Sequence, residues 1–204
     1  MRNLTNVKYV KSLSVLLIVA TKIAIAQQVL PYAPITPAER WQEFKRDSFT
    51  SPDGYLVPLF PAGIAHLKNK PTQWGQGAEG FGRRAGYAYA TNFMDDSILH
   101  ASAAILKNDV RYEASKDSKV LLRLRHAISR TFVTRAQDGR LTFNASNFMS
   151  SYGAGMLATY MLPSESYEPL KYGVRQGHVL IAAHAGANVL KEFTPEIKKL
   201  FHRK

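Results

Sequence analysis

The sequence predicts an all-α protein, a compact bundle of small-residue-rich helices with one short β-hairpin inserted between them. Three observations lead to this fold class. Several segments carry apolar or small residues at intervals of three or four, which is the period of an α-helix. Only one pair of short β-favouring runs surrounds a turn sequence. The 204 residues contain no cysteine, so packing without disulfides must stabilise the fold.

The first 26 residues have the pattern of a cleaved signal peptide. Basic residues precede an apolar run from Leu13 to Ala20, and small residues stand at Ala24–Ala26, with cleavage expected after Ala26. The apolar run is shorter than the roughly 20 residues of a transmembrane helix. An uncleaved anchor is the alternative, which Lys22 within the segment disfavours. We therefore expect an exported protein of the periplasm or cell envelope.

After the signal peptide, the chain divides into an extended arm over residues 27–35 and a single helical domain over residues 36–204. The net charge of the full chain is +12, and the first 26 residues carry four basic residues and no acidic one, which leaves +8. This excess favours contact with an anionic membrane surface, although solubility alone is an equally good explanation. No nucleic-acid recognition motif is present, so nucleic acid is not an expected partner.

The first helix is predicted over residues 36–47. Thr36 is a good N-cap, proline follows it, and Glu39 completes a capping box. The next segment begins with a turn over residues 51–54. Beyond this turn the chain is apolar but is broken by two prolines, so we expect only a short helix near residues 62–68.

The longest helix is predicted over residues 78–106, and its small residues recur every fourth position. This spacing places them in one row along the helix. Glycine within a helix costs about 0.5–1 kcal/mol relative to alanine, so such rows indicate close helix–helix packing. The residues expected to pack are Ala78, Gly82, Gly86 and Ala90 in this helix, Ser146, Ser150, Ala154 and Ala158 in a second, and Gly173 and Gly177 in a third. Such glycine zippers are best known in membranes, but nearby charged residues favour packing within this chain.

Residues 119–131 form a predicted basic amphipathic helix. Leucine and isoleucine lie on one stripe, and Arg123, Arg125 and Arg130 lie largely off it. Such a helix is a candidate for contact with an anionic surface. The alternative is a helix whose apolar stripe faces the core and whose basic face is solvated.

The end of the chain contains the hairpin signal and a last helix. Residues 132–135 and 140–143 favour strands, and Asp138–Gly139 between them is a hairpin turn sequence. Residues 163–168 are expected to form a loop. A short final helix is predicted to start at Thr194–Pro195.

The sequence contains no phosphate-binding loop, no Gly-x-Ser-x-Gly and no His-Glu-x-x-His motif. The spacing of Asp96 and His100 puts both on one face of the long helix, and Asp109 with Arg111 brings ionisable groups together where that helix ends. A metal site needs three or four converging ligands, and local spacing supplies only two. We therefore expect neither a metal nor another cofactor.

Five short segments are spread over most of the mature chain. They are Ile35–Trp41, Gly75–Arg84, Asp109–Tyr112, Phe132–Arg135 and Glu192–Lys198. Together they resemble a family of uncharacterised exported bacterial proteins. The resemblance implies export but no established activity, so it assigns no catalytic residue.

Two classes of function follow from the sequence. The first is a non-enzymatic cell-envelope protein, whose glycine rows pack its helices and whose basic face contacts an anionic membrane or an envelope protein. Self-assembly through the same rows is a variant of it. The alternative is a periplasmic ligand-binding or metal-binding bundle or enzyme that uses His100 with Asp96 and Asp109 with Arg111. We carry the first forward because it requires no missing motif.

Overall fold

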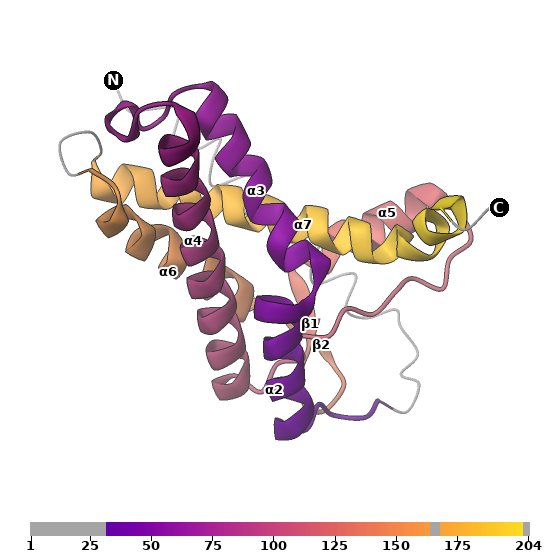
Figure 1. Cartoon of the computed structure of the whole chain (residues 1–204). Helices are drawn as coiled ribbons and strands as arrows, with labels where there is room; N and C mark the ends of the chain where they lie inside the picture. The colour runs from indigo at the N-terminus through magenta and orange to yellow at the C-terminus, as the bar shows by residue number, and fades with distance from the viewer. Residues whose placement is uncertain (1–31, 164–167, 202–204) are drawn as a thin grey trace, which may run out of the picture.

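The computed structural model describes residues 32–163 and 168–201 (Figure 1). The predicted signal peptide, most of the arm over residues 27–35 and the loop at 164–167 lie outside the described residues. Within them are six α-helices and one two-stranded antiparallel hairpin, so the predicted fold class is confirmed. Among the described residues no helix combines the length and apolarity needed to cross a membrane.

Helix α2 (Pro37–Lys45) begins where the sequence predicts and continues into a π-helical turn at Arg46–Thr50. The Thr36 hydroxyl accepts a hydrogen bond from the Glu39 backbone N–H at 3.2 Å, and the Glu39 carboxylate accepts one from the Thr36 N–H at 2.7 Å. Both halves of the predicted capping box are therefore present, which fixes the start of the helix.

Helix α3 (Pro52–Leu67) is longer than predicted, and the expectation of only a short helix near residues 62–68 is wrong. The Ser51 hydroxyl accepts a hydrogen bond from the Gly54 N–H at 3.2 Å and so caps the helix ten residues earlier. The two internal prolines remove backbone hydrogen bonds. Packing of α3 against α4 offsets this loss, since Pro58 and Ala62 are buried.

Helix α4 (Gly77–Ile105) is the longest helix of the first half of the chain, and the loop that leads into it is held by Arg84. This side chain is 1% exposed, and its guanidinium donates hydrogen bonds to the carbonyl oxygens of Lys70, Pro71, Gly75 and Gly80 at 2.8–2.9 Å. A Cβ atom on Gly80 would lie 2.5 Å from the Gly75 oxygen, so only glycine fits there.

Helix α5 (Val120–Ser129) leads into the hairpin of β1 (Val133–Arg135) and β2 (Leu141–Phe143). Val133 pairs with Phe143, and Arg135 pairs with Leu141. Gly139 has a φ of +82°, as the predicted Asp-Gly turn requires. The predicted hairpin is confirmed.

Helix α6 (Ala145–Ala158) follows the hairpin, and helix α7 (Pro169–Phe201) ends the described chain. The expectation of a separate last helix from Thr194 is wrong, because α7 continues through Pro195. The Glu192 and Glu196 carboxylates, on either side of this proline, both bind Arg123 of α5. These two ion pairs stabilise the helix across the proline.

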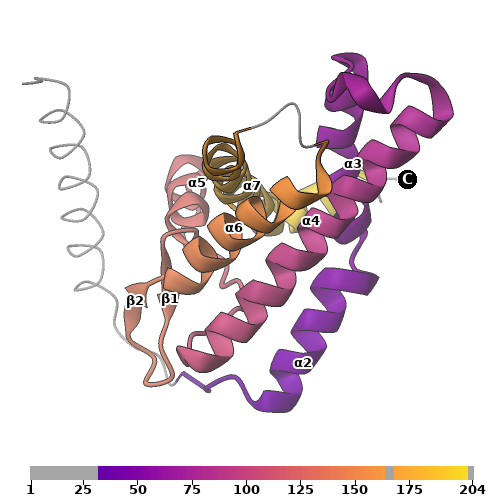
Figure 2. The ribbon, with the colours of Figure 1, turned by 90° about the vertical axis from the view of Figure 1, so that its left-hand side faces the viewer.

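Helices α4, α6 and α7 make the central packing, with α6 in contact with both of the others. Helix α3 packs on α4, and α5 packs on α7. Figure 2 shows α2 and α6 on opposite sides of α4. The core is made largely of small side chains, including Ala103, Ala154 and Ala158, which are at most 1% exposed.

Candidate functional site

The three arginines of the predicted basic face of α5 have different surroundings, and Arg123 points toward α7. Arg123 donates hydrogen bonds to the Glu192 carboxylate at 2.7 Å and to the Glu196 carboxylate at 2.5 Å. Arg130 is 9% exposed and lies 3.8 Å from Glu113. Of the three predicted contact residues only Arg125 is exposed. The expectation that all three present a basic surface is therefore not met.

Glu192 shows why Arg123 faces inward. Its side chain is 1% exposed and accepts hydrogen bonds from Arg123, from the Tyr112 hydroxyl at 2.7 Å and from the Ser115 N–H at 2.9 Å. Burial alone would raise the pKa of Glu192, but these hydrogen bonds outweigh burial and lower the pKa. A buried carboxylate needs such partners. Arg123 therefore points inward, where it pairs with Glu192.

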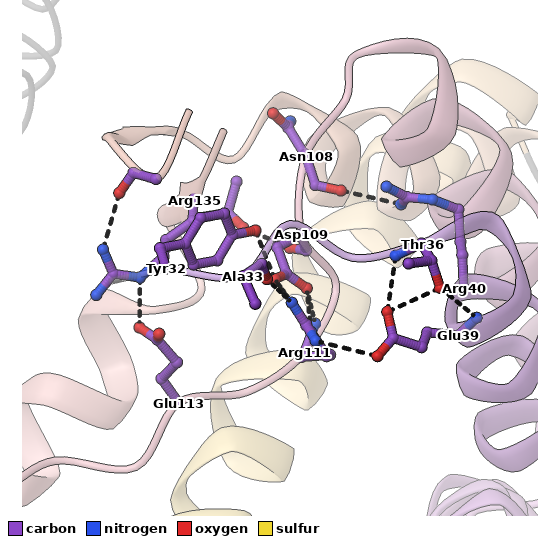
Figure 3. A network of polar contacts seen from close by, with 12 residues as sticks. Tyr32, Ala33, Thr36, Glu39, Arg40, Asn108, Asp109, Arg111, Glu113 and Arg135 are labelled. Carbon is purple, nitrogen blue, oxygen red and sulfur yellow. Dashed lines mark hydrogen bonds and ion pairs between the residues drawn. The ribbon is translucent and has the colours of Figure 1, made fainter. Parts of the chain in front are cut away.

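Asp109 and Arg111 form an anchor for the start of the described chain (Figure 3). Arg111 Nη2 donates to Asp109 Oδ2 at 2.7 Å and to the Ala33 carbonyl at 2.8 Å. The Tyr32 hydroxyl donates to the same Asp109 oxygen at 2.7 Å. Burial tends to raise the pKa of Asp109, but the hydrogen bonds from Arg111 and Tyr32 lower it. These groups bind one another and the N-terminal segment.

Asp96 and His100 lie in a buried carboxylate–histidine cluster, which we define as Asp47, Asp95, Asp96, His100 and His184. Asp95 Oδ2 is 2.6 Å from His184 Nε2, and Asp47 Oδ2 is 3.4 Å from His100 Nε2. Asp96 accepts weaker hydrogen bonds from Ser48 and Asn92 at 3.3 and 3.2 Å. The pair that the sequence groups together thus binds different partners. Asp47, Asp95, Asp96 and His184 line a cavity of about 140 Å³.

The electrostatics of the cluster differ from residue to residue. Burial, and then the neighbouring charges of Asp95 and Asp47, raise the pKa of Asp96 to about 7. Burial tends to lower the pKa of His184, but the Asp95 carboxylate outweighs it and raises the pKa. In the described part of the chain no group of three or more His, Cys, Asp or Glu side chains is arranged to hold a metal ion.

The predicted small-residue rows have different surroundings. Gly173 and Gly177 are buried where α7 crosses α6, and a Cβ atom on Gly155 would lie 2.6 Å from the Gly173 oxygen. On α4, a Cβ atom on Gly82 or Gly86 would have no neighbour within 4 Å. Ala78, Gly82 and Gly86 are exposed, and Ala90 is half-buried. Within the described residues, Gly82 and Gly86 of the α4 row therefore meet no other helix.

An exposed apolar face lies on α3 and was not predicted. We call it the α3 stripe, and its members are Leu56, Phe60, Ile64 and Leu67. Their exposed fractions are 65%, 73%, 39% and 85%. The spacing of four, four and three residues puts them in one line along the helix. The prolines hid this stripe, because they argued against a helix over its first half.

Two exposed lysines follow the α3 stripe. Lys68 is the C-cap residue of α3 and Lys70 lies in the next loop, and neither forms an ion pair within the described residues.

Comparisons of the chain with protein families, with curated proteins and with solved structures find no match. The function is therefore argued from this geometry.

Proposed function

We propose that the chain is an exported, non-enzymatic cell-envelope protein that lies on an anionic membrane surface through helix α3. The observation that carries the proposal is the α3 stripe, with Lys68 and Lys70 at its end. The membrane contact expected from the sequence is thereby moved from the arginines of α5 to another helix.

The apolar character of the α3 stripe supports insertion at the level of the lipid headgroups. Burying one large apolar side chain stabilises an association by about 1.5–3 kcal/mol, and Leu56, Phe60 and Leu67 are each at least 65% exposed. A monomeric protein in water rarely leaves a contiguous apolar patch of this kind without a partner. The helix has 16 residues and includes two internal prolines, so it is proposed to lie in the interface rather than to span the bilayer.

Charge supports an anionic lipid surface as the partner. Each lysine close to an anionic bilayer contributes about 1 kcal/mol of attraction. Lys68 and Lys70 are free to do so, and the chain from Gln27 onward carries a net charge of +8. By contrast, Arg123 and Arg130 are held by carboxylates or buried.

Vesicle flotation of the full chain tests the proposal. We expect the protein to float with phosphatidylglycerol-containing vesicles at low salt and to bind pure phosphatidylcholine vesicles more weakly. Replacing Leu56 and Phe60 together by serine should lower the bound fraction at least about tenfold, since two buried apolar side chains are lost. Both side chains are exposed, so the folded state should be preserved, as circular dichroism would verify.

Matched controls separate α3 from other surfaces. Leu121→Ser with Ile128→Ser removes two exposed apolar side chains from α5 and should leave binding unchanged. Lys68→Glu with Lys70→Glu should weaken binding more than Lys116→Glu with Arg125→Glu, which changes the net charge equally. Equal loss in both members of either pair would contradict the proposal. So would capture of the α3 stripe by a second copy in lipid-free solution, detected as dimerisation that the serine variant abolishes.

Export is tested by fractionating cells that express the full chain. We expect a mature protein that starts at Gln27, found in the membrane fraction and released by high salt or mild detergent. A chain that keeps its first residues and stays in the cytoplasm would contradict the localisation. If the protein is retained in the membrane fraction only through another envelope protein, the α3 stripe would be assigned to that partner.

A further inference from the structure

A second surface feature, separate from the α3 stripe, is a groove between α2 and α4. Its volume is about 540 Å³, which falls within the 300–1,000 Å³ typical of small-molecule sites. Ile35, Trp41 and Phe44 form its apolar wall on the α2 side, and Ala101 and Ala104 form the wall on α4. Trp41 and Phe44 stack with their ring centroids 5.4 Å apart, so this wall is aromatic.

The charged residues of the groove are of one sign. Arg40 and Lys107 line it, and no carboxylate does. Arg40 Nη1 donates to the Asn108 carbonyl at 2.9 Å, which places it beside Lys107 at the end of α4. Burial lowers the pKa of Arg40, but a guanidinium stays charged in proteins. The groove is thus apolar along its length and cationic at one end.

The groove also contains a buried histidine, whose nearest charged neighbour is Asp47. His100 lines it and is 6% exposed, and neither ring nitrogen has a hydrogen-bond partner within the described residues. Its Nε2 is 3.4 Å from Asp47, and its ring packs edge-on against Phe44.

We infer that this groove binds an amphipathic anion of the fatty-acid class. The carboxylate of the ligand is held by Arg40 and Lys107, and its alkyl chain lies along Trp41, Phe44 and the two alanines of α4. A cationic amphiphile would meet two like charges and no carboxylate. The inference does not depend on the membrane contact proposed for α3, because it involves other helices and is tested in the absence of vesicles.

Tryptophan fluorescence measures this binding directly. The chain has two tryptophans, so Trp74→Phe leaves Trp41 in the groove as the sole reporter. Dodecanoate, added below its micelle concentration in lipid-free buffer, should change the emission saturably. Dodecyltrimethylammonium should not compete with it.

Three variants locate the site. Arg40→Gln should weaken dodecanoate binding at least about tenfold, because a charge-assisted contact is lost. Lys107→Asn should weaken it by a smaller factor, and asparagine suits the positive φ of 54° at that position. Ala104→Phe fills the groove from an exposed position and should abolish binding even if the Arg40 variant is poorly folded.

Arg83→Gln is the matched control, because Arg83 is an exposed arginine of α4 that does not line the groove. It should leave the affinity unchanged. Equal affinity for the cationic amphiphile, or unchanged binding in the Ala104 variant, would overturn the inference. Self-association that Ala104→Phe abolishes in the absence of dodecanoate would assign the groove to a second copy and would overturn it as well.

Discussion

Helix α7 meets two of its neighbours, α6 and α4, in opposite ways. Against α6 the backbones come close, because Gly155, Gly173 and Gly177 have no side chains to separate them. Against α4 the contact is made by long polar side chains, with the Asp95 carboxylate 2.6 Å from His184. Both helices carry a row of small residues, but on α4 that row faces outward.

The difference shows that the spacing of small residues predicts which residues share one face of a helix. It does not predict whether another helix packs against that face. On α6 the small face is the buried face, so it sets how closely α7 approaches. On α4 the buried face carries Asp95 and Asp96, and Asp95 contacts α7 through His184. The outward row on α4 therefore has a conformational cost without a packing gain within residues 32–163 and 168–201.

The largest expected effect on the free energy of unfolding comes from Asp96 on the buried face of α4. Because burial, with the charges of Asp95 and Asp47, raises the pKa of Asp96 from 3.8 to about 7, the folded state holds a proton that the unfolded chain releases near pH 4. The free energy of unfolding should therefore fall as pH rises through this window. Asp96→Asn removes the effect, and at about pH 8 it should be more stable than the wild type by about 4 kcal/mol.

Urea unfolding at several pH values measures this difference. The advantage of Asp96→Asn should be absent below pH 4 and complete above about pH 7. Asp138→Asn is a suitable control, because that carboxylate is half-exposed in the hairpin turn. A constant difference between wild type and Asp96→Asn from pH 4 to 8 would argue against a carboxylate that is neutral in the folded protein.

The α6 side is tested by Gly155→Ala. The added Cβ atom would lie 2.6 Å from the Gly173 oxygen and 2.8 Å from the Gly177 nitrogen, and these backbone atoms can move only with the helix. We expect a loss of about 2 kcal/mol in the free energy of unfolding. Gly63→Ala in α3 is the control, since its Cβ atom meets nothing within 4 Å. A neutral Gly155→Ala would show that α7 is free to move away from α6.

The outward small-residue row of α4 gives the smallest effect on the free energy of unfolding, and here substitution is expected to stabilise the fold. Gly82→Ala and Gly86→Ala should each raise the free energy of unfolding by about 0.5–1 kcal/mol, because alanine is the better helix former and the space is open. Thermal unfolding of the two variants measures the gain. Destabilisation, or a loss of assembly in either variant, would instead show that a partner outside the described chain packs against this row.

Local signals in the sequence account for the elements that were predicted correctly. The capping box of Thr36 with Glu39 and the Asp138–Gly139 turn act within a few residues, so they can be recognised without knowing the fold. Helices α3 and α7 were underestimated because proline carries a local cost, whereas the packing that offsets it is tertiary. Pro195 is tolerated because Arg123, distant in sequence, binds α7 on both sides of it.

The candidate sites were harder to predict for the same physical reason. Asp95 and His184 are 89 residues apart, so no spacing rule joins them. An amphipathic pattern in α5 shows that the helix has two faces but not which one is buried, and the partner that decides this is Glu192. The groove between α2 and α4 also depends on tertiary placement, although Arg40, Trp41 and Phe44 stand close together in the sequence.

Arg84 has a consequence for how the α3 stripe meets a partner. Its guanidinium is surrounded by carbonyl oxygens of the loop between α3 and α4, much as an ion is surrounded by water. This arrangement joins the end of α3 to α4 and fixes the angle between the two helices. A surface presented in this way is already ordered before binding, so association has little conformational entropy to lose. If the α3 stripe binds a membrane as proposed, its affinity would depend on its exposed side chains rather than on refolding of the helix.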